Sequence, residues 1–113
     1  MKESVRNIYT GARPASGAEI FETLFEAGAV RIERITSHAS SSPEGFWYDQ
    51  EQDEWILLLR GAAVLEFAAG ELIEMREGDC LIIPRHVRHR VRETSEETIW
   101  LAVHLKEPPG NSH

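Results

Sequence analysis

Cysteine is nearly absent from this sequence of 113 residues, because Cys80 is the only one. A single cysteine excludes an intrachain disulfide and a cysteine-rich zinc module, and it favours a reducing compartment. Long hydrophobic runs are also missing: the longest, Trp55 to Leu59, is much shorter than the roughly 20 residues of a membrane-spanning helix. The first residues lack the apolar stretch of a signal peptide. We therefore expect a cytoplasmic protein with no membrane partner.

Basic residues are scarce. The sequence has 12 Lys and Arg against 19 Asp and Glu, which gives a formal net charge of −7. Because nucleic-acid affinity depends largely on basic side chains that neutralise phosphates, this balance argues against a nucleic-acid partner. A local exception is a group of arginines that forms either a clamp for an anionic substrate or a solvated strand face: Arg85, Arg88, Arg90 and Arg92.

Short apolar stretches separated by turn signals fill most of the chain, and no convincing helical period interrupts them. The runs Glu19 to Phe25 and Ala29 to Ile35 predict a hairpin whose charged side chains face solvent, although the first run is also compatible with a short helix. Strands of this length and spacing predict an antiparallel all-β barrel or sandwich. The other expected strands are 55–59, 63–67, 71–75, 80–83, 86–92 and 99–105.

The chain is expected to form one domain, because it contains no internal repeat, no low-complexity tract and no linker. Its core spans about residues 29–105, between an irregular lead-in over 1–18 and a flexible tail over 106–113. Gly78 lies in a turn that favours a positive φ. Pro84 lacks the N–H that a strand ladder needs, so it should end the strand before it.

Two segments resemble the paired motifs of the cupin superfamily, whose small jelly-roll β-barrels hold metal ligands inside the barrel. The first motif reads G-x5-H-x-H-x4-E-x6-G, and Glu54 and Gly61 match its end. The second reads G-x5-P-x-G-x2-H-x3-N, and Gly78, Pro84 and His89 match it in order. The resemblance implies an antiparallel jelly-roll barrel. We also expect a homodimer, because a second copy often covers the strand edges of small jelly rolls.

The departures from the cupin pattern fall on its metal-ligand positions. With the four-residue gap before Glu54, Trp47 and Asp49 stand where the first motif has its two histidines. With a three-residue gap, Tyr48 and Gln50 stand there instead, and strand alternation would place both on the same face as Glu54. We favour Asp49, because the four-residue gap is the commoner one and a carboxylate suits a divalent metal better than a phenol or an amide.

The resemblance therefore predicts that Asp49, Glu54 and His89 hold one divalent metal ion, which is Zn, Mn, Fe or Ni. A neutral imidazole is the commonest transition-metal ligand, and a carboxylate that faces a barrel interior must be paired, coordinated or protonated. The alternatives are an internal, hydrogen-bonded histidine at 89 and solvated carboxylates at 49 and 54. His104 and His38 are further candidate ligands, with structural roles as their alternative.

Two classes of function remain open. The first is a metal-dependent enzyme of the isomerase, lyase or dioxygenase type that acts on a small molecule at open metal positions. The second is a non-catalytic module that binds or senses a small ligand. Retention of Glu54 and His89 favours the first class, whereas loss of both first-motif histidines favours the second. His86 is a further departure, because it replaces a glycine of the second motif.

Overall fold

The computed structural model describes residues 5–11 and 13–106. All regular structure in these ranges is β-strand, and nothing in them forms a helix long and apolar enough to cross a membrane. The segment 19–27 is therefore a strand and not the short helix that its sequence also allowed. Most of the predicted flexible tail lies outside the described residues. The strands are β1 (Glu19–Ala27), β2 (Val30–Ser37), β3 (Asp53–Arg60), β4 (Ala62–Phe67), β5 (Leu72–Arg76), β6 (Cys80–Ile83), β7 (His89–Thr94) and β8 (Thr98–Leu105).

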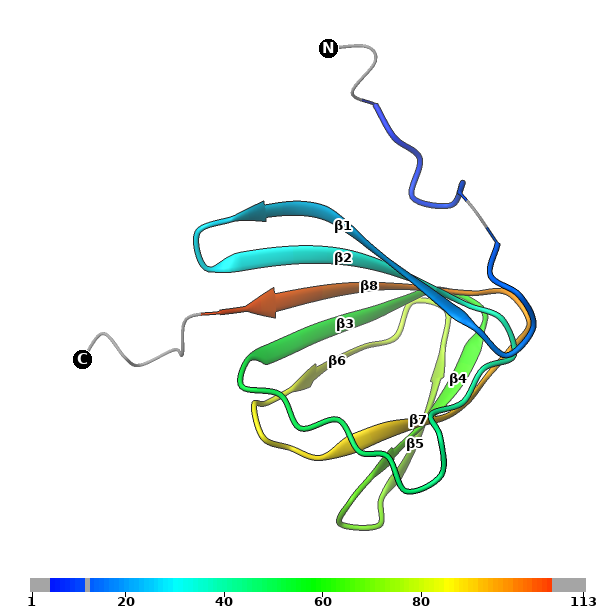
Figure 1. Cartoon of the computed structure of the whole chain (residues 1–113), viewed down its shortest axis with the longest axis vertical. Coiled ribbons are helices and arrows are strands. Elements are labelled where there is room, and N and C mark those ends of the chain that lie inside the picture. The colour runs from blue at the N-terminus through cyan, green and yellow to red at the C-terminus, as the bar shows by residue number, and fades with distance from the viewer. Residues whose placement is uncertain (1–4, 12, 107–113) are drawn as a thin grey trace.

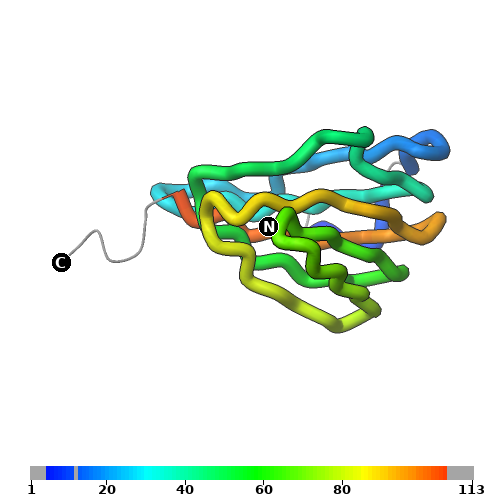
Figure 2. Tube along the Cα trace, turned by 90° about the horizontal axis from the view of Figure 1, so that it is seen from below, coloured from blue at the N-terminus to red at the C-terminus, as the bar shows by residue number. Residues whose placement is uncertain are grey.

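The strands form two antiparallel sheets that face each other (Figure 1). The larger sheet has the order β1-β2-β8-β3-β6, and the smaller one has the order β5-β4-β7. The tube view in Figure 2 shows the same strands running back and forth between the two ends of a flattened barrel. This arrangement confirms the predicted antiparallel all-β jelly-roll class. β6 ends at Ile83, immediately before Pro84, as predicted.

The β1–β2 hairpin forms as predicted, but the prediction that its charged side chains all face solvent is wrong. Glu33 and Arg34 are 9% and 5% exposed. Strict alternation along β2 places Glu33 on the same face as Ile35, toward the barrel interior. On the opposite face, the Arg34 guanidinium donates from Nε to Glu22 at 3.0 Å and from Nη1 to the carbonyl of Ile8 at 3.0 Å. Arg34 thereby fixes the N-terminal segment against the hairpin.

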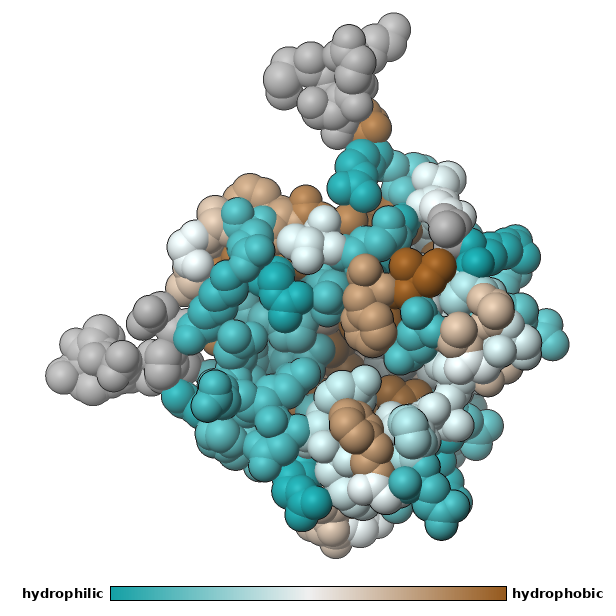
Figure 3. All heavy atoms as spheres, in the orientation of Figure 1, coloured by the Kyte–Doolittle hydropathy of each residue, from teal (hydrophilic) through white to brown (hydrophobic). Residues whose placement is uncertain are grey.

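The hydrophobic core lies between the two sheets. Leu58 on β3 is fully buried, and it lies beside Trp100 of β8 in the strand register and packs toward Leu65 of β4. Side chains alternate along β3, so Glu54, Ile56 and Leu58 point to this same interior face. The outer surface in Figure 3 is largely hydrophilic, with apolar residues in separate patches. The packing of β3 therefore forces the Glu54 carboxylate inward.

β7 begins three residues later than the sequence predicts. His86 has a φ of 62°, a left-handed conformation that L residues adopt reluctantly, and its N–H donates to the carbonyl of Gln50 at 2.8 Å. This conformation explains why a glycine suits the same position of the cupin motif. The turn ends where His89 starts the strand.

Two glycines with positive φ differ in the space around them, so their replacement by alanine should lower the free energy of unfolding by different amounts. Gly61 (φ 92°) lies between β3 and β4, and an added Cβ would collide with the carbonyl oxygen of Glu97. Gly78 (φ 90°) confirms the positive φ expected from its turn, but nothing lies within 4 Å of an added Cβ.

Gly78→Ala should therefore cost about 1 kcal/mol of unfolding free energy through backbone strain alone. Gly61→Ala should cost at least about 2 kcal/mol more. Urea unfolding of the two variants measures this, and equal midpoints would contradict the predicted difference.

Candidate active site in the barrel

A cavity opens between the two sheets, beside the start of β3 and the start of β7. The space open to the centre of a water molecule is about 80 Å³, which is room for a few water molecules. Aromatic and aliphatic side chains from both sheets form part of its wall. The polar part of the wall comes from Glu19, Glu33, Gln50, Glu54, His89 and His104.

Glu54, the second residue of β3, is 6% exposed. Its carboxylate makes no hydrogen bond to any residue that the structure describes, and the Nε2 atom of His104 lies 3.9 Å from Oε2. Burial raises the pKa of Glu54 to about 7, the negative charge of Glu33 adds to this increase, and Arg31 opposes it. Glu54 is therefore a buried carboxyl that can both take up and release a proton near neutral pH.

His89 lies on the opposite sheet, at the start of β7, and is 5% exposed. Its Nδ1 donates to the carbonyl oxygen of Val87 at 2.9 Å, and burial lowers the pKa of the ring. A neutral ring that donates from Nδ1 keeps its Nε2 lone pair as an acceptor. The Tyr48 ring stacks on the imidazole at 5.5 Å between centroids, which fixes the orientation of His89. Glu54 and His89 thus reach one cavity from opposite walls.

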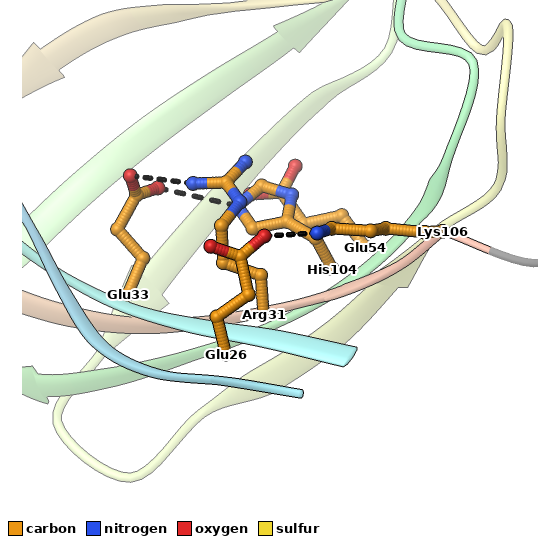
Figure 4. Close-up of polar contacts among 6 residues, drawn as sticks. All are labelled: Glu26, Arg31, Glu33, Glu54, His104 and Lys106. Carbon is orange, nitrogen blue, oxygen red and sulfur yellow. Dashed lines mark hydrogen bonds and ion pairs between the residues drawn. The ribbon is translucent and has the colours of Figure 1, made fainter. Parts of the chain in front are cut away.

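His104 links the cavity to a cluster of charged residues (Figure 4). In the β-register His104 is paired with Arg31 on one side and Glu54 on the other. Its Nε2 lies 3.2 Å from Oε1 of Glu33, and Arg31 donates from Nη1 to the other oxygen of Glu33 at 2.9 Å. Burial lowers the pKa of His104, so the neutral ring donates to Glu33. The cluster holds Glu33 and His104 in place beside Glu54.

Comparison with known proteins identifies the family. The family profile described as a cupin domain matches residues 28–104. The chain belongs to the cupin family. It is similar to a candidate mannose-6-phosphate isomerase from Ralstonia eutropha JMP134, with 42% identity over 91% of this chain and 98% of that one and a TM-score of 0.84. A cupin superfamily protein from Desulfitobacterium hafniense shares the fold at 20% identity, with a TM-score of 0.72 over 85% of this chain and 84% of that one.

Curated relatives of this cupin include two enzymes named 3-hydroxyanthranilate 3,4-dioxygenase. The one from Ruegeria pomeroyi is 34% identical over 67 residues, which are 57% of this chain and 37% of the relative. The one from Jannaschia sp. is 30% identical over a match of the same extent. The chain therefore matches little more than a third of the length of these enzymes.

The structure shows which residues of the two possible alignments of the first cupin motif line the cavity. Tyr48 and Gln50, which correspond to the three-residue gap, line the cavity together with Glu54. The backbone of Tyr48 bridges to that of His89, with N–H to carbonyl distances of 2.7 and 3.1 Å. This bridge turns the side chains of Tyr48 and Gln50 inward. Sequence reasoning considered both residues, but it weighed the chemistry of Asp49 above the alternation of side chains along the chain.

Asp49 and Trp47, which correspond to the four-residue gap, do not line the cavity. The Asp49 carboxylate is about half exposed and lies 2.8 Å from Nδ1 of His86. The guanidinium carbons of Arg88 and Arg90 lie 5.8 and 5.9 Å from the centre of the Trp47 ring. The structure thus brings Glu54 and His89 together and leaves Asp49 at the rim.

Of the three residues expected to hold a metal ion, Glu54 and His89 face the cavity, whereas Asp49 lies at its rim. Glu54 and His89 are strong ligands, but Tyr48 and Gln50 offer only a phenol and an amide in the positions of the family's histidines. Within residues 5–11 and 13–106, no group of three or more His, Cys, Asp or Glu side chains is placed to hold a metal ion.

Sequence reasoning missed two acidic residues of the cavity wall, Glu19 and Glu33. The signal for Glu33 was strict alternation back from Ile35, which places it on the inner face of β2. His38 lies elsewhere: its Nδ1 is 3.2 Å from the carbonyl oxygen of Pro14, in the loop before β1. His104 does line the cavity, where it bonds Glu33.

Proposed function

We propose that this cupin is a small-molecule enzyme of the isomerase or lyase type that moves a proton inside the barrel cavity. The observation that carries the proposal is the Glu54 carboxyl, which is buried and faces the cavity without a hydrogen bond to the described residues. Burial of such a group is costly, and strongly perturbed carboxyls in clefts are typical of catalytic sites. The name of the Ralstonia relative, a candidate isomerase, supports the same class.

In this mechanism Glu54 takes a proton from a substrate carbon next to a carbonyl group, and the C–H electron pair moves toward the carbonyl to form an enolate. In an isomerase the carbon that loses the proton also carries a hydroxyl group, whose proton moves to the former carbonyl oxygen while Glu54 returns its own proton to the former carbonyl carbon. In a lyase the enolate expels a leaving group from the next carbon, and the leaving group takes up the proton that Glu54 holds. A pKa of about 7 suits this task, because a general base works best when its pKa lies near the working pH. His89 accepts a hydrogen bond at Nε2 from a substrate hydroxyl or amine and thereby orients the substrate.

Exchange of carbon-bound hydrogen with deuterated water tests this function across a range of candidate substrates. The protein is incubated with a panel of small hydroxy- and amino-substituted aldehydes and ketones, and loss of C–H signals is followed by proton NMR. We expect exchange with the parent protein and a loss of roughly 100-fold or more in Glu54→Gln, the usual size of a general-base contribution. Glu74→Gln, on the exposed face of β5, is the matched control. Exchange that survives in Glu54→Gln would show that Glu54 is not the base.

Other expectations from the sequence stay predictions. A non-catalytic binding module would bind a small molecule in the same cavity without any C–H exchange. The single divalent ion, with Asp49, Glu54 and His89 as ligands, would give this cupin the Lewis-acid chemistry expected of metal-dependent family members. The homodimer is compatible with β1, an edge strand on which Phe21 and Phe25 are more than half exposed.

A further inference from the structure

The cavity has a negative charge that nothing on its own wall balances. Three glutamates line it from three different strands: Glu19 from β1, Glu33 from β2 and Glu54 from β3. Among the described residues that line the cavity, none is a lysine or an arginine. The two lining histidines each direct one ring nitrogen to a protein oxygen, His89 to the carbonyl of Val87 and His104 to the carboxylate of Glu33.

Two of these carboxylates already have protein partners, but Glu54 does not. Glu33 accepts from Arg31 and His104, and Glu19 accepts from the hydroxyl of Ser37 at 2.6 Å. Glu54 is more than nine-tenths buried and makes no hydrogen bond within the described part of the chain. Arg31 itself lines a separate outer hollow, and its guanidinium is paired with Glu33 at 2.9 Å. The Glu54 carboxylate opens onto the cavity, so a donor group of a molecule that enters the cavity can bind it.

The remaining polar groups of the cavity also favour a hydrogen-bond donor. The Nε2 atom of His89 is an acceptor, because Nδ1 holds the ring proton. Burial and the charges of Glu19, Glu54 and Glu33 raise the pKa of Tyr48, so the negative potential extends to its hydroxyl. The aromatic rings of Tyr48 and Phe21 form part of the wall, and the faces of aromatic rings attract cations.

We infer that the substrate of this cavity is a small amine whose positively charged nitrogen binds at the Glu54 carboxylate. The inference rests on the proposed function for the choice of this cavity as the substrate site. The cavity volume of about 80 Å³ restricts the enclosed part of the molecule to a small group of a few non-hydrogen atoms. A carboxylate or phosphate group would meet the charges of Glu19, Glu33 and Glu54 with no basic residue on the wall to receive it.

Three probes of one shape test this inference: isobutylamine, isobutanol and isobutyrate, which are cationic, neutral and anionic at pH 8. Binding is followed by NMR shifts of the Trp100 and His89 side chains, which report on the cavity. We expect isobutylamine to bind at least about tenfold more tightly than the other two, and Glu54→Gln to remove about tenfold of its affinity. Glu74→Gln removes one charge outside the cavity and should leave binding unchanged. Thermal unfolding confirms that each variant is folded.

Tighter binding of isobutyrate or isobutanol would overturn the inference, as would the absence of amine binding. Zinc or nickel that shifts the same Trp100 and His89 resonances and prevents isobutylamine from binding would overturn the inference in favour of a metal site. Different results would contradict the proposed function and the amine inference. Amine binding that depends on Glu54, without any C–H exchange, contradicts the isomerase or lyase proposal but not the amine site. C–H exchange that occurs only with neutral or anionic compounds contradicts the amine site but not the isomerase or lyase proposal.

Discussion

Replacement of Glu54 by glutamine is expected to stabilise the folded protein at pH 8 while it removes most of the proposed activity. The pKa of this carboxyl is raised from 4.5 to about 7, chiefly by burial. One pKa unit corresponds to about 1.4 kcal/mol, so the ionised carboxylate costs the folded state about 3 kcal/mol. Glutamine has nearly the same shape and no charge to bury, so the variant avoids this cost.

The sign of the effect follows from proton binding. Between pH 4.5 and about 7 the folded state holds a proton on Glu54 that the unfolded chain has lost, so the free energy of unfolding falls as the pH rises. Glu54→Gln lacks this dependence. Its stability relative to the parent should therefore increase by about 3 kcal/mol between pH 4 and pH 8, with most of the change between 4.5 and 7. Both proteins keep His89 and His104, whose own titration largely cancels in the comparison.

Urea unfolding of parent and Glu54→Gln at a series of pH values measures this difference. Glu74→Gln, which is exposed on β5, serves as the control and should follow the parent within about 0.5 kcal/mol at every pH. A constant difference between Glu54→Gln and the parent would mean that the carboxyl is not desolvated in the folded protein. A gain in stability together with a loss of exchange activity is the pattern expected of a strained functional group.

The second large effect is a gain of metal binding in the double variant Tyr48→His/Gln50→His. Both side chains line the cavity with Glu54 and His89, so the change completes a set of three imidazoles and one carboxylate. Loss of a residue that only orients a metal ligand costs about 10–100-fold in affinity, so the addition of two ligands should gain at least roughly 100-fold for Ni or Zn. Calorimetric titration of parent and variant at one pH measures the gain, and elemental analysis of both proteins shows what they retain.

Trp47→His/Asp49→His is the matched control, because it adds two histidines one residue away in each case. The Asp49 carboxylate is half exposed at the rim, and the Trp47 ring lies near the guanidinium groups of Arg88 and Arg90, so this variant should bind nickel no more than about threefold better than the parent. A larger gain in the control than in Tyr48→His/Gln50→His would place Asp49 in the ligand position that the sequence first suggested. Metal bound tightly by the parent itself would support the resident ion expected from the family.

Much of the architecture followed from local signals in the sequence. Turn glycines, Pro84 and short apolar runs placed most strand boundaries within one or two residues, because each signal acts on its own segment of backbone. The cupin motifs placed Glu54 and His89 in one barrel, and both do line one cavity. The β7 boundary was missed because His86 adopts a left-handed conformation that is unusual for a residue other than glycine.

The charged groups of the site needed the tertiary structure. Glu33 is distant from Glu54 in the sequence and joins it only because β8 lies between β2 and β3 and brings His104 to both. The choice between Gln50 and Asp49 depended on the bridge between Tyr48 and His89, a contact between segments about 40 residues apart. The sequence alone determined the family, the sheet-forming segments and the presence of a carboxylate and an imidazole in the barrel, because these depend on local pattern and motif spacing. Only the packing of the two sheets decided which acidic side chains are desolvated. Desolvation determines the pKa values of the ionisable groups that line the cavity, and therefore their charge.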